Sequence, residues 1–167
     1  RTIQKAANTL SAGQRVLIMN GTYRENIVQT RDGLPGQPIV FANYPGHAPV
    51  IDGVDWTGTG GLFHFNYARN VTLSGLSLIN AYRSGQSAIR AEHTDGLTIE
   101  NCYTYNSASS GAKIRYCSGI TIRGNEFEQA CLSGDEETIT ITRGTHNVLI
   151  EGNYLHDCEK EGVDIKH

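Results

Sequence analysis

The chain has 167 residues, a formal net charge of −3, and no run of lysine or arginine. This length suits one domain with a substantial core, and the charge pattern argues against a nucleic-acid partner. No apolar stretch approaches the ~20 residues of a membrane-spanning helix, so we expect no membrane partner. The four cysteines form no C-x-x-C pair, which excludes a zinc knuckle.

The N-terminal stretch TIQKAANTL has the apolar spacing of a helix. Ile3, Ala6, Ala7 and Leu10 share one face, and the turn residues Ser11 to Gly13 follow. We therefore expect a short amphipathic helix at residues 2–10 that caps one end of the fold. The stretches RVLIMNGTYREN, PIVFANYPG and PVIDG come next and read as short strands in irregular first coils.

The most informative feature is an internal repeat. Four segments align: NVTLSGLSLINA, GLTIENCYTYNS, GITIRGNEFEQA and NVLIEGNYLHDC, whose first apolar residues are spaced 26, 23 and 28 apart. Each is followed by a second alternating strand, SAIRAE, AKIRYC, TITITR or VDIKH. The spacing fits one coil of a parallel β-helix. An antiparallel sandwich is less favoured, because its strands need not resemble one another.

The aligned repeats place equivalent residues in columns. Two columns read as interior: Leu73, Ile99, Ile122 and Ile150, and Leu78, Thr104, Phe127 and Leu155. Asn125 and Asn153 share a turn position, where an asparagine side chain can hydrogen-bond to the next coil.

The whole chain, residues 1–167, is thus predicted to be a single all-β domain, a parallel β-helix whose most regular coils lie at 70–167. No cap follows the last strand, and a bare solenoid end would expose strand edges. We therefore expect a longer natural protein, truncated here at the C-terminus.

The opening of the chain resembles a known family. The I-Q-x-A helix, the A-G-x-x-V and G-T-Y-x-E motifs, and the PIVFANYPGHAPVIDG stretch resemble the N-terminal part of secreted right-handed parallel β-helix proteins. These include polysaccharide lyases of the pectate lyase type, particularly family nine, and related uronate-acting enzymes. The resemblance implies a right-handed solenoid, an acidic polysaccharide partner, and a secreted or cell-surface location, although the chain carries no signal peptide. It does not fix the chemistry, because one fold hosts many activities.

Alternation along the second strands predicts an outward-facing polar strip. We define this polar strip by two rows, His64, Arg90, Lys113, Thr140 and Asp164, and Asn66, Glu92, Arg115, Thr142 and Lys166. Val163 and Ile165 are expected in the core. Arg90, Lys113 and Arg115 are candidate substrate-binding residues, since they would attract uronate carboxylates. An ordinary solvated strand face is the alternative.

Two acidic turns, GDEE and DCEKEGVD, fall in adjacent coils. Asp135, Glu161 and Asp164 are candidate metal ligands, because several carboxylates in one place favour Ca²⁺. Solvated acidic turns are the alternative. Cys131 and Cys158 occupy similar turn positions, and either a disulfide or two stacked thiols would fit.

The favoured function is a calcium-dependent uronate lyase that works by β-elimination, with Lys166 as the catalytic base or a substrate contact. A non-catalytic polysaccharide-binding module is the main alternative, and a glycoside hydrolase or uronate epimerase is less favoured. We expect a monomer.

Overall fold

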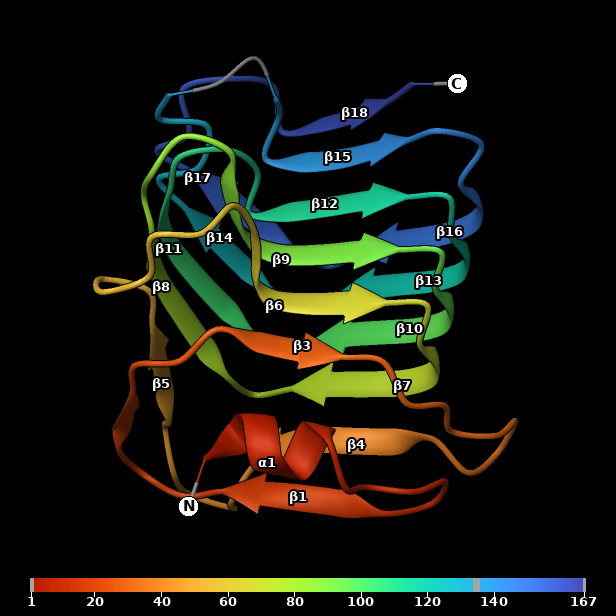
Figure 1. The fold of residues 1–167 in the computed structure, drawn as a ribbon. Helices are drawn as coiled ribbons and strands as arrows, with labels where there is room; N and C mark the ends of the chain where they lie inside the picture. Colours follow the sequence, from red (N-terminus) through yellow and green to blue (C-terminus); the bar gives the residue numbers. More distant parts are fainter. Residues whose placement is uncertain (1, 134–135, 167) are drawn as a thin grey trace.

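The structure is a computed structural model that describes residues 2–133 and 136–166. The chain winds through three strands per coil, so that three six-stranded sheets run along the length of a solenoid (Figure 1). Successive coils pair in parallel, as β7, β10 and β13 do in one sheet and β9, β12 and β15 do in another. This confirms the predicted parallel β-helix and rules out the antiparallel sandwich.

The three sheets are named by letters. Sheet A contains β1 (Arg15–Ile18), β4 (Ile39–Asn43), β7 (Arg69–Ser74), β10 (Asp95–Glu100), β13 (Ser118–Arg123) and β16 (His146–Glu151). Sheet B contains β2 (Thr22–Tyr23), β5 (Val50–Asp52), β8 (Ser77–Ala81), β11 (Tyr103–Ser107), β14 (Glu126–Glu128) and β17 (Tyr154–His156). Sheet C contains β3 (Ile27–Gln29), β6 (Gly60–Asn66), β9 (Gln86–Glu92), β12 (Ala112–Arg115), β15 (Ile139–Thr142) and β18 (Val163–Ile165).

The repeat seen in the sequence is the register of the sheets. In sheet A, Ile99 pairs with Leu73 on one side and with Ile122 on the other, and Ile122 pairs with Ile150. In sheet B, the second predicted column forms in the same way, through the pairs Thr104–Leu78, Thr104–Phe127 and Phe127–Leu155. Both predicted columns are therefore confirmed, and their members are buried except for Ile150 and Leu155 of the last coil, which are half-buried against the core.

Apolar side chains from all three sheets fill the interior of the solenoid. Phe41 of sheet A packs edge-on against Phe63 of sheet C, with ring centroids 5.2 Å apart, and Phe63 stacks on Phe65 at 4.8 Å. All three rings are fully buried. Burying a side chain of this size stabilises the fold by roughly 1.5–3 kcal/mol, so the interior columns supply the main favourable term.

Helix α1 (Ile3–Ala7) closes the N-terminal end of the solenoid and lies at the bottom of Figure 1. Ile3 and Ala7 are buried against the first coils. The Gln4 side chain donates to the Val28 carbonyl at 3.0 Å and accepts from the Val28 N–H at 2.7 Å, which satisfies the outer edge of β3. Glu25 accepts from the N–H groups of Ile3 and Gln4 and so caps the helix. In the described residues, no helix has the length and apolar character needed to cross a membrane.

Two apolar side chains of the last coil are not buried as expected. Val163 and Ile165 pair with Ile139 and Ile141, so they have the predicted register. The prediction that they lie in the core is nevertheless wrong, because Val163 is 43% exposed and Ile165 is 60% exposed. Their strand is the last in sheet C, so apolar neighbours pack on one side only. Alternation fixes the side of the sheet, but burial also needs a neighbouring coil on each side.

The predicted asparagine ladder is present at the turn between sheets A and B. The Asn125 backbone N–H and its side-chain amide both donate to Asn153 Oδ1 at 2.9 Å. Asn125 Nδ2 also donates to the Ile99 carbonyl at 3.0 Å, and its Oδ1 accepts from the Cys102 N–H at 2.9 Å. Asn125 is only 2% exposed, so its amide replaces water for two buried backbone groups of the preceding coil and bonds to the Asn153 side chain of the next.

Replacing Asn125 with Ala should lower the free energy of unfolding by about 1–3 kcal/mol, because buried backbone groups lose their partners. Asn153→Ala should act in the same direction. Chemical denaturation of each variant measures the change. Asn66→Ala is a matched control, since Asn66 is half-buried and no side-chain hydrogen bond to it is found in the described chain. Equal stability of Asn125→Ala and the control would show that the ladder contributes nothing.

Candidate functional site

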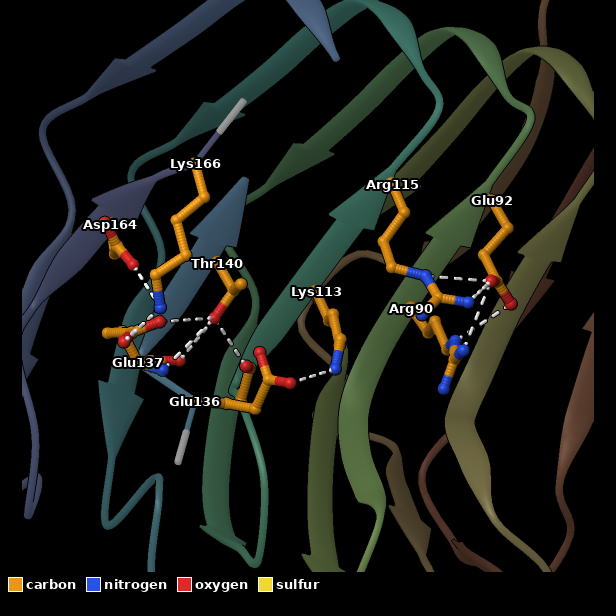
Figure 2. Close-up of polar contacts among 10 residues, drawn as sticks. Arg90, Glu92, Lys113, Arg115, Glu136, Glu137, Thr140, Asp164 and Lys166 are labelled. Carbon is orange, nitrogen blue, oxygen red and sulfur yellow. Dashed lines mark hydrogen bonds and ion pairs between the residues drawn. The ribbon is translucent and has the colours of Figure 1, made fainter. Parts of the chain in front are cut away.

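The polar strip lies on the outer face of sheet C, with the two rows that alternation predicts (Figure 2). His64, Arg90, Lys113, Thr140 and Asp164 follow one another across β6, β9, β12, β15 and β18. Asn66, Glu92, Arg115 and Thr142 form the second row. Parallel strands lie about 4.8 Å apart, so equivalent side chains of neighbouring coils are close enough to contact one another, as Glu92 and Arg115 do.

Glu92 is the centre of the best-defined cluster. Arg90 donates to both oxygens of the Glu92 carboxylate, from Nε to Oε2 at 2.9 Å and from Nη2 to Oε1 at 3.1 Å. Arg115, from the next coil, donates to Oε1 through Nε at 3.0 Å and through Nη2. His64 Nε2 lies 3.1 Å from Glu92 Oε2. One carboxylate therefore holds two guanidinium groups in place, and the imidazole lies beside it although His64 Nε2 has no hydrogen-bond partner among the described residues.

These contacts set the charge states of the cluster. Burial alone would raise the pKa of Glu92, but the hydrogen bonds from Arg90 and Arg115 outweigh it and lower the pKa to about 2. Burial lowers the pKa of His64, and Arg90 and Arg115 push it in the same direction, against the opposing effect of Glu92. At neutral pH the cluster therefore contains an ionised Glu92 and a neutral imidazole.

The loop before β15 covers part of the polar strip. Glu136 forms an ion pair with Lys113, and Glu137 lies over Thr140 (Figure 2). Thr140 Oγ1 donates to the Glu137 carbonyl at 3.1 Å and lies 2.9 Å from Ser110 Oγ. The expectation that Thr140 faces solvent is wrong, because it is fully buried beneath this loop. A local pattern of alternating residues cannot show where a loop folds back.

Lys166 is held between two carboxylates. Its Nζ lies 2.9 Å from Glu137 Oε1 and 2.6 Å from Asp164 Oδ2. Hydrogen bonding to Asp164 and then to Glu137 raises the pKa of Lys166 above its ordinary value. Lys166 is therefore a protonated side chain in this arrangement, which suits it to contact an anion.

On the described part of this face, each cation is paired with a carboxylate. The cations are Arg90, Lys113, Arg115 and Lys166, and their carboxylate partners are Glu92, Glu136, Glu137 and Asp164. Each predicted substrate-binding residue thus already has an anionic partner. A uronate carboxylate would have to share these cations or compete for them.

The predicted metal ligands are only partly described. Asp135 lies outside the described residues. Glu161 is exposed, and its carbonyl accepts from the Thr138 N–H at 3.0 Å. Asp164 does converge with a second carboxylate, but that residue is Glu137, and the Lys166 ammonium lies between the two. Two carboxylates this close together can supply some of the oxygen ligands of a Ca²⁺ site. Calcium takes 6–8 oxygen ligands, so further ligands would be needed.

A different group of ligand-type side chains lies on the outer face of sheet B. Glu126, Glu128 and His156 have ligand atoms within 4.8 Å of one another and could bind a metal ion. His156 Nδ1 lies 2.8 Å from Asp157 and Nε2 lies 3.1 Å from Glu126, and these contacts raise its pKa. A metal would have to displace a proton from His156, and an imidazole is not a preferred calcium ligand. The signal in the sequence was the alternation of Glu126 and Glu128, with His156 paired beside Glu128.

The cysteines form no disulfide bond. Cys131 is buried and Cys158 is half-buried, and both are free thiols. Burial raises the pKa of Cys131 to about 12, so it is an uncharged and unreactive group. Of the two alternatives for this pair, the structure has the free thiols.

Residues 1–158 match the family model described as the Pel9A-like right-handed β-helix region. The chain belongs to this Pel9A-like family. The match confirms both the right-handed solenoid and the resemblance to family-nine pectate lyases that the opening motifs indicated.

The individual relatives share only a small fraction of identical residues with this chain. The uncharacterized protein YwoF of Bacillus subtilis (strain 168) is 26% identical over 183 residues, which cover 99% of this chain and 39% of YwoF. Alginate lyase from Paenibacillus sp. str. FPU-7 has a TM-score of 0.77 at 16% identity, over 98% of this chain and 60% of that enzyme. Pectate lyase Pel9A has a TM-score of 0.71 at 16% identity, over 96% of this chain and 44% of Pel9A.

These likenesses show a polysaccharide-lyase-like β-helix fold. At 16% identity they do not show which reaction or substrate belongs to this chain. The chain also spans less than two thirds of the length of each of these relatives.

Glu92→Gln should destabilise the fold at neutral pH by about 2 kcal/mol, because Arg90 and Arg115 lose their common carboxylate. The pKa of Glu92 is lowered from 4.5 to about 2, so its stabilising effect is present above pH 4.5 and is lost as the pH falls towards 2. Unfolding measured from pH 7 to pH 2 should therefore show a weaker acid dependence in the variant than in the wild type.

Glu100→Gln is the matched control for this experiment. Glu100 pairs with Arg123 at 2.7 Å on sheet A, but the Arg123 side chain is 53% exposed, so solvent screening should make the loss clearly smaller than that of Glu92→Gln. If the two variants lose the same stability, the Glu92 cluster is an ordinary surface ion pair.

Proposed function

We propose that this chain is part of a polysaccharide lyase that cleaves a uronate-containing polymer by β-elimination, outside the cell or at its surface. The observation that carries the proposal is the Arg90–Glu92–Arg115 cluster on the outer face of sheet C. It places two fixed guanidinium groups on a strip that runs along the solenoid, within a Pel9A-like chain.

The reaction needs a charge partner and a base. A base removes the proton on the carbon next to the uronate carboxylate, a carbon–carbon double bond forms, and the bond to the glycosidic oxygen breaks. The leaving oxygen then takes up a proton. The carboxylate resists this step while it carries its full negative charge, so its oxygens must be bound by cationic or donor groups.

Arg90, Arg115 and Lys113 are proposed to hold uronate carboxylates. Arg90 and Arg115 bind Glu92 through Nε and Nη2. A guanidinium has five N–H donors, so each arginine still has donors that can reach a second carboxylate. Glu92 orients the two groups, so the substrate meets donors in fixed positions, with little further loss of side-chain freedom.

Two side chains are candidates for the base. Lys166 fits this role only if its proton is released, and its ion pairs with Glu137 and Asp164 oppose that release. Calcium, if bound by Glu137 and Asp164 in place of the ammonium, would supply positive charge to neutralise the uronate carboxylate. His64 is the second candidate, because burial keeps its imidazole neutral beside the two arginines.

A non-catalytic polysaccharide-binding module is the second candidate function. The observation in its favour is that Arg90, Lys113, Arg115 and Lys166 are each paired with a carboxylate among the residues that the structure describes. A balanced surface of this kind can exchange partners with an acidic polymer without any proton transfer.

Incubation of the full-length protein that contains this chain with polygalacturonate and alginate, with and without calcium, tests the leading proposal. Arg115→Ala should lower kcat/KM by roughly 10- to 100-fold, as expected for the loss of hydrogen bonds to a charged group. The measurement is the ultraviolet absorbance of unsaturated uronate ends. Binding of both polymers without any unsaturated product would favour the binding module and exclude the lyase.

Separate variants identify the base. Loss of the base should reduce kcat by about 10²–10⁴-fold while substrate binding is retained. Parallel loss of binding and turnover in Lys166→Ala would make Lys166 a substrate contact, and selective loss of kcat in His64→Gln would assign the base to His64. Lys160→Ala, at an exposed position in the preceding turn, is the control for a general change in charge.

A further inference from the structure

A column of aromatic rings lies at the turn from sheet C to sheet A, outside the polar strip. Tyr67, His93 and Tyr116 occupy equivalent positions in three successive coils, directly after β6, β9 and β12. Their ring centroids are 4.5 and 4.7 Å apart, and the planes differ by only 9° and 2°. All three side chains are exposed, Tyr67 to 64%. We call these residues the ring column.

The backbone at the ring column is in a conformation that large side chains disfavour. Tyr67, His93 and Tyr116 have φ angles of 56°, 50° and 55°, in the left-handed region. The coils use this conformation in three other columns: Asn70, Gly96, Gly119 and Asn147; Gly75, Asn101, Gly124 and Gly152; and Asn80, Asn106, Gln129 and Asp157.

Ten of these twelve other residues are glycine or asparagine, which adopt the conformation at low cost. The ring column therefore keeps bulky, exposed rings where the fold elsewhere uses small residues. Strain of this kind at a surface position is an observation from which a binding role can be inferred.

The ring column lines a groove of about 450 Å³. The same groove is lined by the first residues of four strands of sheet A, which are Arg69, Asp95, Ser118 and His146. These four residues pair in sequence across neighbouring strands. The groove thus follows the solenoid axis across three coil intervals, a length on the order of 14 Å.

The two ends of this groove are cationic. Arg69 lies at the level of Tyr67, and Arg143 continues the ring column one coil beyond Tyr116. Both arginines are exposed, and neither takes part in an ion pair within the described residues. Between them lie neutral donors and acceptors and one carboxylate, Asp95, which accepts a hydrogen bond of 2.5 Å from Ser118. The groove therefore fits a linear ligand that has hydroxyl groups along its length and carries negative charge.

We propose that this groove binds a strand of acidic polysaccharide parallel to the solenoid axis, at a site separate from the polar strip. Arg69 and Arg143 bind carboxylates of the strand, Asp95 and Ser118 hydrogen-bond to sugar hydroxyls, and the edges of the stacked tyrosine and histidine rings contact the sugar. The choice of an acidic polymer rests on the proposed function, whereas the groove and its rings do not depend on it.

Isothermal titration of the protein with oligogalacturonate and oligoalginate tests this proposal. Tyr67→Asn and Tyr116→Asn remove a ring but tolerate the left-handed backbone, so both variants should fold. Each should weaken binding by roughly tenfold, and Arg143→Ala should also reduce the salt dependence of the affinity. Tyr154→Ala is the matched control, because it removes an exposed tyrosine stacked on His156 at 4.4 Å on another face.

Unchanged affinity in both ring variants would overturn the proposal, and so would equal binding of a neutral polysaccharide. The outcomes also separate this proposal from the proposed function. Ring-dependent binding without unsaturated products would remove only the lyase reaction. Elimination that proceeds with wild-type binding in the ring variants would remove only the groove.

Discussion

In-register pairing between coils is the constraint on which the rest of the molecule depends. Each parallel ladder fixes neighbouring coils about 4.8 Å apart, so a residue type that recurs once per coil becomes a continuous column. The interior apolar columns, the asparagine ladder, the polar strip and the ring column all result from this one spacing. Insertions in the turns leave it unchanged, which explains why repeats of 23 and 28 residues stack in one sheet.

Much of the fold could be predicted because period-two alternation and repetition report local geometry. The spacing of the repeats was enough to place Leu73, Ile99 and Ile122 in one column, and to assign the amide of Asn125 to a ladder. The degree to which Val163 and Ile165 are buried could not be predicted in this way. It depends on whether another coil packs against them, and their own sequence does not contain that information.

The outward direction of the basic side chains on the polar strip was predicted from the sequence, but their ion pairs were not. Alternation placed Arg90, Lys113 and Arg115 on the outer face, yet it gave no sign that Glu92 would bind two of them. Glu136, the partner of Lys113, and Glu137, one of the two partners of Lys166, lie just before β15 and reach the strip through tertiary contacts. The ring column was missed as well, although its signal in the sequence is simple. An aromatic ring directly follows the sheet C strand in three successive coils.

The contact between Gln4 and β3 has a consequence for how the solenoid ends. A primary amide offers one acceptor and two donor hydrogens, so a single side chain can imitate the peptide group of a further strand. Gln4 uses this property to occupy both the N–H and the carbonyl of Val28. A foreign strand approaching this edge of sheet C finds no free pairing groups at Val28 and must first displace the helix. The covered edge at Val28 therefore resists the strand pairing through which an open edge would act as a template for polymerisation.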